Sequence, residues 1–401
     1  MAQPARIDPT CQSCGSDDTR VFYSVDQIPV HSCLLMPTER EAIEYPKGDM
    51  RLAFCEACGF IQNSAFDASV HEYSTRYEET QAFSPRFQSF VDELVDRYDT
   101  MFGLAGKSVL EIGCGKGEFL VRMCEVGGCD GIGIDPGYRP ERTTAQTNSR
   151  LQFIQDFYSE QYTHLQADLV ICRHTLEHIR PTHDFMSMVR RSIGERPATA
   201  VCFELPDIER ILEDRGFWDV YYEHCSYFSR GSLARLFRTT GFDLVALDRV
   251  YDDQYILIDA HPRPAERGAC DAEPLPQESD LGRLRELVQA FETELPATLA
   301  KWAQVFTEAK RLGKKTAIWG SGSKAVAFLT SLGLGDQVDA VTDINPYRQG
   351  MFMPGTGHRI VPPADLAELR PELVVAMNPI YLEEIGADLR EMGLDPELLA
   401  V

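Results

Sequence analysis

Strand-like runs that end in glycine and lead into helix-like runs most restrict how this chain can fold. The first series begins at Lys107 with the run KSVLEIG and extends to about residue 262. A second series begins near residue 314 with KKTAIWGSGS. Short apolar strands that alternate with helices are typical of a doubly wound, mostly parallel sheet. The sequence therefore predicts an α/β fold with two Rossmann-like units, one central and one C-terminal.

Composition divides the rest of the chain. A length of 401 residues suggests two or three domains. Residues 1–65 combine two cysteine pairs, several prolines and short β-like runs, which indicates a small loop-rich module. Residues 261–280 are rich in proline, acidic and small side chains, which predicts a linker. A long helix is predicted to follow over about 281–312. We therefore expect three domains, at residues 1–80, 81–262 and 263–401.

The charge balance excludes some classes of partner. The chain has 39 Lys and Arg residues against 62 Asp and Glu residues, a formal charge of −23. We expect no nucleic acid and no anionic membrane as partner, because both attract cationic proteins. The N-terminus shows no apolar signal segment, and no stretch approaches the roughly 20 apolar residues of a membrane span. We expect a cytoplasmic monomer or homodimer that acts on a small molecule.

Two C-x-x-C pairs, Cys11 with Cys14 and Cys55 with Cys58, indicate a metal site. Four thiolates on two tight turns can surround one ion in a tetrahedron, and zinc suits such a set. We expect a structural site, because four thiolates leave no position for a reacting water. A redox C-x-x-C or an accidental spacing is the alternative.

The run LEIGCGKG, at residues 110–117, closes the first strand of the central series. Glycines at this point let the backbone approach a ligand at the start of the next helix. Asp135 ends the second strand, where an acid can accept both ribose hydroxyls of a nucleoside. This pattern resembles motif I of class I S-adenosylmethionine (SAM) methyltransferases, with NAD binding as the alternative. The residues expected to bind the cofactor are Glu111, Gly113, Gly115, Gly117, Asp135, Pro136, Asp156, Phe157, Arg173 and His174.

Two polar stretches follow later strands, at the sheet edge where such folds bind ligands. RHTLEH occupies residues 173–178 and YYEHCSYF occupies residues 221–228. Histidine is the usual group that removes a proton near neutral pH. His174 and His178 could share a helix face and suggest a metal, but no third ligand is evident. For the second stretch, a helix-capping turn with aromatic packing is the alternative.

The C-terminal series opens with WGSGSK at residues 319–324. Gly and Ser amides at a helix start can cradle a phosphate, and Lys324 adds positive charge. Asp343 ends the next strand, as in a dinucleotide-binding fold. A Rossmann-like scaffold without a ligand is the alternative.

These motifs occur together in an order that resembles the three-domain sugar C-methyltransferases. The four cysteines come first, then the glycine motif, then EHCSYF at 223–228, then DINPYRQGMFMPGTGHRI at 343–360. The resemblance covers nearly the whole chain. It implies an N-terminal zinc-binding domain, a central class I methyltransferase domain and a C-terminal Rossmann-like domain. It also implies methylation of a ring carbon beside the keto group of a nucleotide-activated deoxysugar.

The resemblance further implies roles for individual residues. It implies that His224 is the base and that His178 lines the site. It also implies that Glu223 and Tyr221 hold the sugar. A tyrosine from the end of the zinc domain reaches the sugar, with Tyr77 the candidate and Tyr73 the alternative. The nucleotide lies between the central and C-terminal domains. The residues expected to bind substrate are Tyr222, Gly320, Gly322, Ser323 and Lys324.

The methyl sulfonium of SAM requires a carbon nucleophile for C-methylation. We expect His224 to remove a proton beside a ketone, while Tyr221 or His178 holds the enolate oxygen. Zinc takes no part in this step. The alternative functions are an O-methyltransferase, an N-methyltransferase, a C-methyltransferase of a non-sugar ketone and, from another class, an NAD-binding oxidoreductase.

Overall fold

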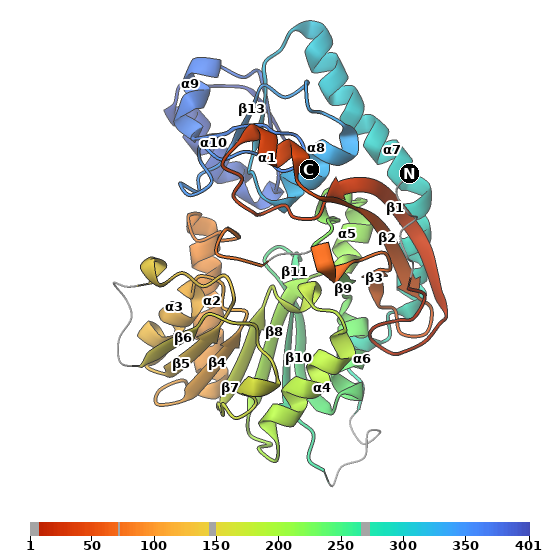
Figure 1. Cartoon of the computed structure of the whole chain (residues 1–401), viewed down its shortest axis with the longest axis vertical. Coiled ribbons are helices and arrows are strands. Elements are labelled where there is room, and N and C mark those ends of the chain that lie inside the picture. The colour runs from red at the N-terminus through yellow and green to blue at the C-terminus, as the bar shows by residue number, and fades with distance from the viewer. Residues whose placement is uncertain (1–7, 71–72, 144–149, 266–272) are drawn as a thin grey trace.

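The computed structural model describes residues 8–70, 73–143, 150–265 and 273–401 of the chain. Strands of these residues form one antiparallel sheet and two doubly wound sheets, arranged as in Figure 1. The α/β fold class predicted from the sequence is therefore confirmed. The domain boundaries at residues 80 and 262 stay predictions. Part of the expected linker, residues 266–272, lies outside the described residues.

The N-terminal sheet has the strand order β1–β2–β3–β9. Its first two strands pair antiparallel from Thr19 opposite Cys55 to Pro29 opposite Lys47. The fourth strand comes from the central part of the chain and pairs Tyr227 with Ile61. The EHCSYF stretch is therefore attached to the N-terminal sheet by backbone hydrogen bonds. The elements are β1 (Thr19–Pro29), α1 (Glu39–Glu44), β2 (Lys47–Cys55), β3 (Ile61–Asn63) and β9 (Ser226–Tyr227).

The central sheet has seven strands in the order β10–β11–β8–β7–β4–β5–β6. Its strands are parallel except where β11 runs antiparallel to both β8 and β10. The order reverses between β4 and β7, and the carboxyl ends at such a switch point form a ligand-binding crevice. The strands are β4 (Ser108–Ile112), β5 (Asp130–Ile134), β6 (Leu151–Ile154), β7 (Leu169–Arg173), β8 (Ala200–Pro206), β10 (Phe242–Val250) and β11 (Tyr255–Pro262).

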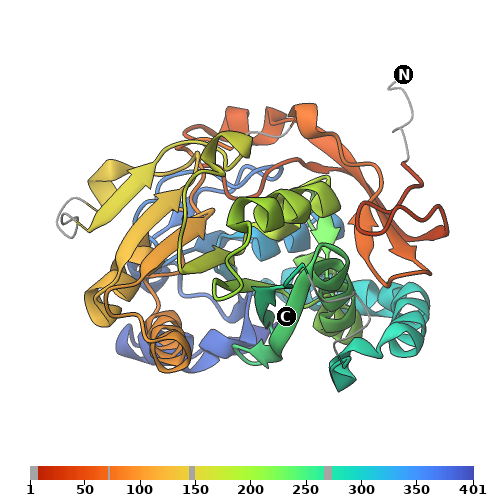
Figure 2. The same ribbon diagram turned by 90° about the horizontal axis from the view of Figure 1, so that it is seen from below.

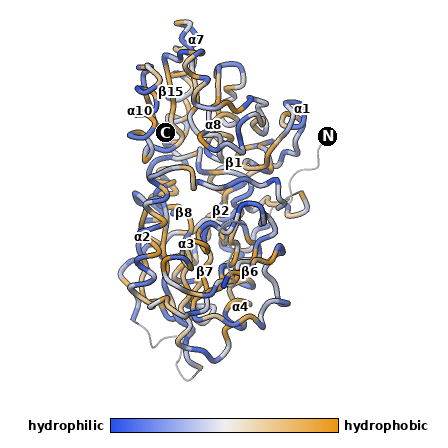
Figure 3. The backbone as a smooth tube through the Cα atoms, turned by 90° about the vertical axis from the view of Figure 1, so that its left-hand side faces the viewer, coloured by the Kyte–Doolittle hydropathy of each residue, from blue (hydrophilic) through white to orange (hydrophobic). Residues whose placement is uncertain are grey.

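Alternating apolar residues on these strands explain why helices cover both faces of the sheet (Figure 2). Val109, Leu169 and Ile171 pack in one cluster with α2 (Pro85–Phe102) and α3 (Glu118–Gly127). The intervening residues Leu110, Val170 and Cys172 pack in another cluster with α4 (Thr182–Ile193) and α6 (Arg230–Thr239). In Figure 3 the inner strands β7 and β8 are accordingly hydrophobic along most of their length.

The C-terminal sheet is wholly parallel, with the order β14–β13–β12–β15–β16. Its order reverses between β12 and β15, so it has a switch point of its own. The elements are β12 (Thr316–Trp319), α8 (Ser323–Leu332), β13 (Ala340–Thr342), β14 (Ile360–Val361), α9 (Leu366–Leu369), β15 (Leu373–Ala376), α10 (Leu382–Glu391) and β16 (Glu397–Ala400).

A long helix, α7 (Leu281–Leu312), packs against elements of the N-terminal and C-terminal units and against α5 (Ile208–Asp214) of the central unit. Phe291 on this helix makes an edge contact with Phe22 of β1, and Trp302 makes one with Phe328 of α8. Together with α5, these elements share one hydrophobic cluster. The N-terminal sheet and the C-terminal sheet are thus held by a common core. Among the described residues, no helix combines the length and the apolar character needed to cross a membrane.

Candidate functional site

A cavity of about 1570 Å³ is lined by residues from all three parts of the chain. A pocket for one small molecule usually holds about 300–1,000 Å³, so this cavity has room for two ligands. The central sheet contributes the carboxyl ends of β4, β5 and β7, which is the crevice expected at its switch point. The C-terminal sheet contributes the loops after β12 and β15.

The glycine loop after β4 forms one wall of the cavity. Gly113, Gly115 and Gly117 have φ angles of +72°, +54° and +83°, a region that L side chains rarely adopt. A Cβ atom at Gly113 would overlap the side chain of Thr175, and one at Gly117 would overlap the ring of Phe153. Glycine is therefore required for both the path of the loop and its packing. Gly113 and Gly115 line the cavity, whereas Gly117 lies behind them at the N-terminus of α3.

Asp135, directly after β5, lies against this loop at the cavity wall. Its two carboxylate oxygens accept hydrogen bonds from the backbone amides of Gly115, at 2.9 Å, and Gly137, at 2.6 Å. Burial raises the pKa of Asp135, although both amide hydrogen bonds oppose this shift. Asp135 and Pro136 both line the cavity, as expected for residues that contact a nucleoside. Each oxygen keeps lone-pair capacity for a ribose hydroxyl.

Three more residues of the predicted cofactor set lie at the same wall. Glu111 is fully buried, and its Oε2 atom has no hydrogen-bond partner among the described residues. Burial raises its pKa to about 8. Arg173 donates to both oxygens of Glu204, at 2.8 and 3.2 Å, and the Nε2 atom of His174 lies 2.8 Å from the same carboxylate. The orphaned Glu111 oxygen and the glycine cradle both fit a bound SAM, whereas the Arg173 guanidinium is already paired.

The structure does not bring Asp156 to the cavity. The residue is half-buried, and its carboxylate accepts hydrogen bonds from the Tyr162 hydroxyl and the Gln161 amide, both at 2.7 Å. Its neighbour Phe157 does line the cavity, and 56% of this residue is exposed. The aromatic ring rather than the acid is therefore placed to contact a ligand.

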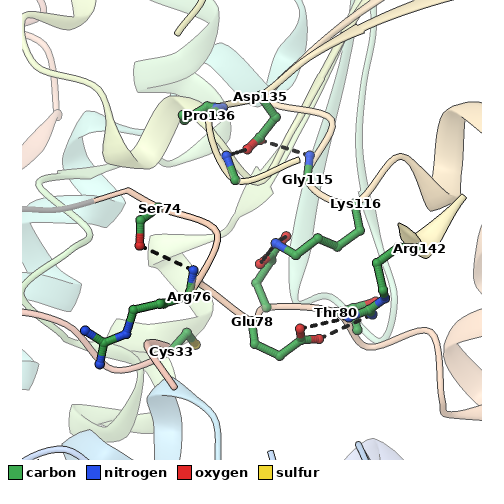
Figure 4. A network of polar contacts seen from close by, with 12 residues as sticks. Cys33, Ser74, Arg76, Glu78, Thr80, Gly115, Lys116, Asp135, Pro136 and Arg142 are labelled. Atoms are coloured by element: carbon green, nitrogen blue, oxygen red, sulfur yellow. Dashed lines mark hydrogen bonds and ion pairs between the residues drawn. The ribbon is translucent and has the colours of Figure 1, made fainter. Parts of the chain in front are cut away.

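A segment that follows the N-terminal sheet, residues 73–84, crosses the front of the glycine loop (Figure 4). Glu79 forms an ion pair with Lys116 of the loop at 3.1 Å. Glu78 is completely buried and pairs with Arg142 at 3.0 Å, while the Asn345 amide donates to it at 3.0 Å. Sequence reasoning missed these residues. Two adjacent acidic residues in a polar segment were the only sign in the sequence that this segment could form ion pairs. The neighbouring residues do not indicate which distant side chains are the partners.

A group of aromatic and imidazole rings lies deeper in the cavity. The ring centroid of His224 is 4.2 Å from that of Tyr221 and 4.7 Å from that of His178. Tyr73 contacts His178 at 5.5 Å, and Tyr77 lies 5.3 Å from Tyr73. All five rings line the same cavity as the glycine loop. The structure thus brings both tyrosine candidates to this group, with Tyr73 the one that contacts His178.

His178 is held in one orientation by the backbone. Its Nδ1 atom lies 3.0 Å from the carbonyl oxygen of Glu223, to which it donates as the N–H tautomer. Burial lowers the pKa of His178 to about 4, so the ring is neutral at neutral pH. Its Nε2 atom is therefore the one that keeps a lone pair for a ligand.

Glu223 and Tyr222 lie beside this ring group but outside the cavity lining. The Glu223 carboxylate is bound by His31 at 2.8 Å, by the Ser32 hydroxyl, and by the Ser323 hydroxyl at 3.2 Å. The Tyr222 hydroxyl accepts a hydrogen bond from the backbone amide of Asp67 at 2.8 Å. Glu223 therefore joins the three parts of the chain from beneath the site, and Tyr222 packs away from it.

The loop after β12 supplies the opposite end of the cavity. Gly320, Gly322, Ser323 and Lys324 all line it, as the sequence suggested for substrate-binding residues. The Lys324 ammonium forms an ion pair with Asp219 of the central part at 2.8 Å. This pair joins the two Rossmann-like units across the cavity.

The second switch point repeats the hydrogen-bond pattern of the first. Asp343 accepts from the Ser321 backbone amide at 2.8 Å and from its hydroxyl at 2.6 Å. An acid after the second strand thus organises the loop after the first strand, as Asp135 does with Gly115 in the central unit.

The four cysteines of the N-terminal module form one cluster. Sγ of Cys11 lies 3.6 Å from Sγ of Cys58, Sγ of Cys14 lies 3.7 Å from Sγ of Cys55, and all four atoms lie within 4.8 Å of one another. Tetrahedral zinc with bonds of about 2.3 Å separates its sulfur ligands by about 3.8 Å. The sulfur positions therefore fit a zinc ion. Each turn closes with a glycine amide that donates to the first cysteine's carbonyl oxygen, at 2.9 and 2.8 Å.

Comparisons with known proteins agree with this architecture. Residues 81–247 match the methyltransferase domain family, and residues 272–395 match the C-methyltransferase C-terminal domain family. The chain is 26% identical to the C-methyltransferase NovU of Streptomyces niveus, over 94% of this chain and 90% of that protein.

Two solved structures show more distant similarity. The N,N-8-amino-8-demethyl-D-riboflavin dimethyltransferase of Streptomyces davawensis has a TM-score of 0.36 and 19% identity, over 44% of this chain and 54% of that one. The 1,6-didemethyltoxoflavin N1-methyltransferase of Burkholderia thailandensis, solved with S-adenosylhomocysteine, has a TM-score of 0.35 and 16% identity, over 43% of this chain and 78% of that one.

The similarity to known proteins lies in the order of the domains and not in one motif alone. A methyltransferase domain with the glycine loop precedes a C-terminal domain found in C-methyltransferases. The relative that spans nearly the whole chain is itself a C-methyltransferase. Together, the two domain matches and this relative support a SAM-dependent C-methyltransferase built from several domains.

Proposed function

We propose that this enzyme methylates a carbon beside the keto group of a nucleotide-activated deoxysugar, and that His224 is the base. One observation carries the proposal: the His224–Tyr221–His178 group lies in the same cavity as the glycine loop. The sugar nucleotide follows from the resemblance of the 223–228 and 343–360 stretches to sugar C-methyltransferases. Cys11, Cys14, Cys55 and Cys58 hold a structural zinc.

The first step of the reaction makes the carbon nucleophile. His224 takes the proton from the carbon beside the ketone, and the electron pair moves onto the carbonyl oxygen. The Tyr221 hydroxyl donates a hydrogen bond to this oxygen. Burial keeps the pKa of Tyr221 well above 10, so the hydroxyl stays protonated. A donor fixed in a buried site stabilises the enolate more than water would.

The second step, methyl transfer, depends on how the two ligands are positioned relative to each other. Bound SAM supplies an electrophilic methyl group on a sulfonium. Asp135 and the amides of the glycine loop fix the nucleoside end of the cofactor. The ring group holds the sugar in the adjoining part of the cavity. Both ligands are thereby held in one cleft, which removes most of the entropic cost of their encounter.

The C-terminal end of the cavity would receive the nucleotide. Lys324 is cationic and half-buried, and it lies at the N-terminus of α8, where backbone amides favour an anion. A diphosphate at this place would share Lys324 with Asp219 or replace that carboxylate. The N-terminal position of Ser323 and Gly322 allows their amides to contribute as well.

Exchange of the sugar's α-proton tests the proposal without methyl transfer. A nucleoside-diphosphate ketodeoxyhexose is incubated in heavy water with S-adenosylhomocysteine in place of SAM, and deuterium uptake is followed by NMR. The wild type should exchange the proton beside the ketone. His224→Asn should lose exchange and methylation by roughly 10²–10⁴-fold while both ligands still bind.

The matched control for this experiment is His183→Asn, an exposed histidine on α4. It should exchange and methylate like the wild type. If His224→Asn methylates at the wild-type rate with normal binding, the base lies elsewhere. An O- or N-methyl transfer would then fit better, because an atom that is already nucleophilic needs little beyond proximity.

A further inference from the structure

Glu177, His178 and His224 form a cluster at the cavity wall, and the methyl-transfer mechanism gives no role to Glu177. One ligand atom from each residue lies within 4.8 Å of the others, and all three residues line the cavity. The sequence suggested a metal through His174 and His178 but offered no third ligand. In the structure His174 is instead paired with Glu204. Glu177 and His224 are the residues that lie beside His178.

Glu177 is the unusual member of this cluster. Only 2% of the residue is exposed, and its Oε2 atom has no hydrogen-bond partner among the described residues. Its other oxygen lies 3.8 Å from Nδ1 of His174, beyond hydrogen-bond distance. A buried carboxylate oxygen without a hydrogen-bond partner is costly. A cation at this point would satisfy the carboxylate.

The orientation of His178 also fits a metal ligand. Its Nδ1 atom is hydrogen-bonded to the backbone carbonyl of Glu223 at 3.0 Å, which leaves Nε2 as the atom able to coordinate an ion. Histidines that bind metals usually donate their second ring N–H to a carbonyl or carboxylate in this way. A neutral imidazole is the form that coordinates a metal.

We propose that Glu177, His178 and His224 bind one zinc-like divalent transition-metal ion. This ion inhibits methyl transfer because it coordinates the imidazole of His224. Two imidazoles and one carboxylate are a ligand set that zinc accepts, with a fourth position left for water. Nitrogen and oxygen ligands on tetrahedral zinc lie about 3.3 Å apart. The ligand atoms of the three side chains therefore need to approach one another by only about 1–1.5 Å. The inhibitory part of the proposal rests on the proposed role of His224 as base.

Cobalt(II) is the probe that separates this site from the cysteine cluster. Cobalt on thiolates gives an intense near-ultraviolet charge-transfer band, whereas cobalt on nitrogen and oxygen ligands gives only weak visible bands. Titration of the full-length protein should therefore show one ion with visible bands alone. Glu177→Gln and His178→Gln should weaken its binding by more than the roughly 10–100-fold that results from loss of an outer-shell partner.

His183→Gln is the matched control, because it removes an exposed imidazole that lies 3.8 Å from the carboxylate of Asp184. It should bind cobalt like the wild type. A protein that binds no such ion, or a Glu177→Gln variant that binds it with wild-type affinity, overturns the site.

Methyl transfer is then measured with zinc added and with zinc removed by a chelator. The wild type should be inhibited reversibly, and Glu177→Gln should lose that inhibition relative to its own metal-free rate. An ion that binds through Glu177 but leaves the rate unchanged overturns the inhibitory role, while the metal site stands. Failure of the proton-exchange experiment with cobalt binding intact counts against the proposed function and the inhibitory role, while the metal site stands.

Discussion

The Nδ1 atom of His31 lies 2.8 Å from Oε2 of Glu223, and both side chains are almost completely buried. His31 follows the first strand of the N-terminal sheet, whereas Glu223 precedes the His224 of the ring group. The backbone carbonyl of Glu223 in turn accepts the hydrogen bond of His178. The N-terminal module therefore positions the EHCSYF stretch of the central unit.

Glu223→Gln should lower the free energy of unfolding by about 3–5 kcal/mol, the cost of breaking a buried pair. Burial raises the pKa of Glu223, but the hydrogen bond and charge of His31 lower it by more, so the folded-state pKa lies below 4.5. The ionised carboxylate therefore stabilises the fold fully above about pH 4.5. Its contribution is lost as the pH falls through the folded-state pKa. Urea denaturation at several pH values measures this difference.

The control for this prediction is Glu292→Gln, which removes an exposed ion pair with Arg20. Its effect should be no more than about 1 kcal/mol. Equal losses in the two variants would contradict the assignment of the His31–Glu223 pair as a structural link.

Cys55→Ser should remove the zinc from the N-terminal module and lower the melting temperature. Three thiolates bind the ion less well than four, and metal binding and folding are linked in small modules. Elemental analysis should give one zinc per chain in the wild type and much less in the variant. Cys129→Ser, in the core of the central unit, should keep its zinc even if its stability falls. A wild type without zinc that is unaffected by chelators would refute this site.

Asp135→Asn should weaken SAM binding by about 1.5–3 kcal/mol, the range for a hydrogen bond to a charged group. The amide can still accept one of the two backbone hydrogen bonds, so the glycine loop keeps part of its support. Calorimetry measures the change. Asp130→Asn, at the exposed start of the same strand, should bind SAM normally. Unchanged affinity in Asp135→Asn would place the ribose elsewhere.

Lys324→Gln should raise the KM for the sugar nucleotide by roughly 10–100-fold, because a charge-assisted bond of about 1.5–3 kcal/mol is lost. The affinity for SAM should not change, since the lysine lies at the far end of the cavity. Steady-state kinetics with both substrates separates these effects. Lys310→Gln, which breaks an exposed pair with Asp336, is the control. A rise in the KM for SAM alone would show that the two ligand positions are reversed.

The sequence by itself predicted features that depend on local pattern. The glycine loop at 113–117 was predictable because a tight turn between strand and helix demands glycine. The paired cysteines predicted their cluster because a C-x-x-C turn places two sulfurs on one side. The helix α7 follows the range expected from its spacing of apolar residues. In each case the information lies within a few consecutive residues.

Neighbouring residues with opposite roles could not be separated in this way. Tyr221 and Tyr222 are both tyrosines in one polar stretch, yet the first lines the cavity and the second packs beside Phe66. Asp156 and Phe157 are also neighbours, but only Phe157 lines the cavity. Side-chain direction at a turn is set by packing against distant segments, which sequence spacing does not encode.

Only the tertiary structure decided which distant groups meet. The His31–Glu223 pair joins residues 192 positions apart, and the Lys324–Asp219 pair joins residues 105 positions apart. The sequence placed His174 and His178 four residues apart without a third metal ligand, whereas the fold brings Glu177 and His224 close to His178. Local periodicity determines strands, helices and turns because it acts through adjacent residues. The pairing of buried charges depends on how whole sheets and helices pack, and that is decided by the shared core of the three units.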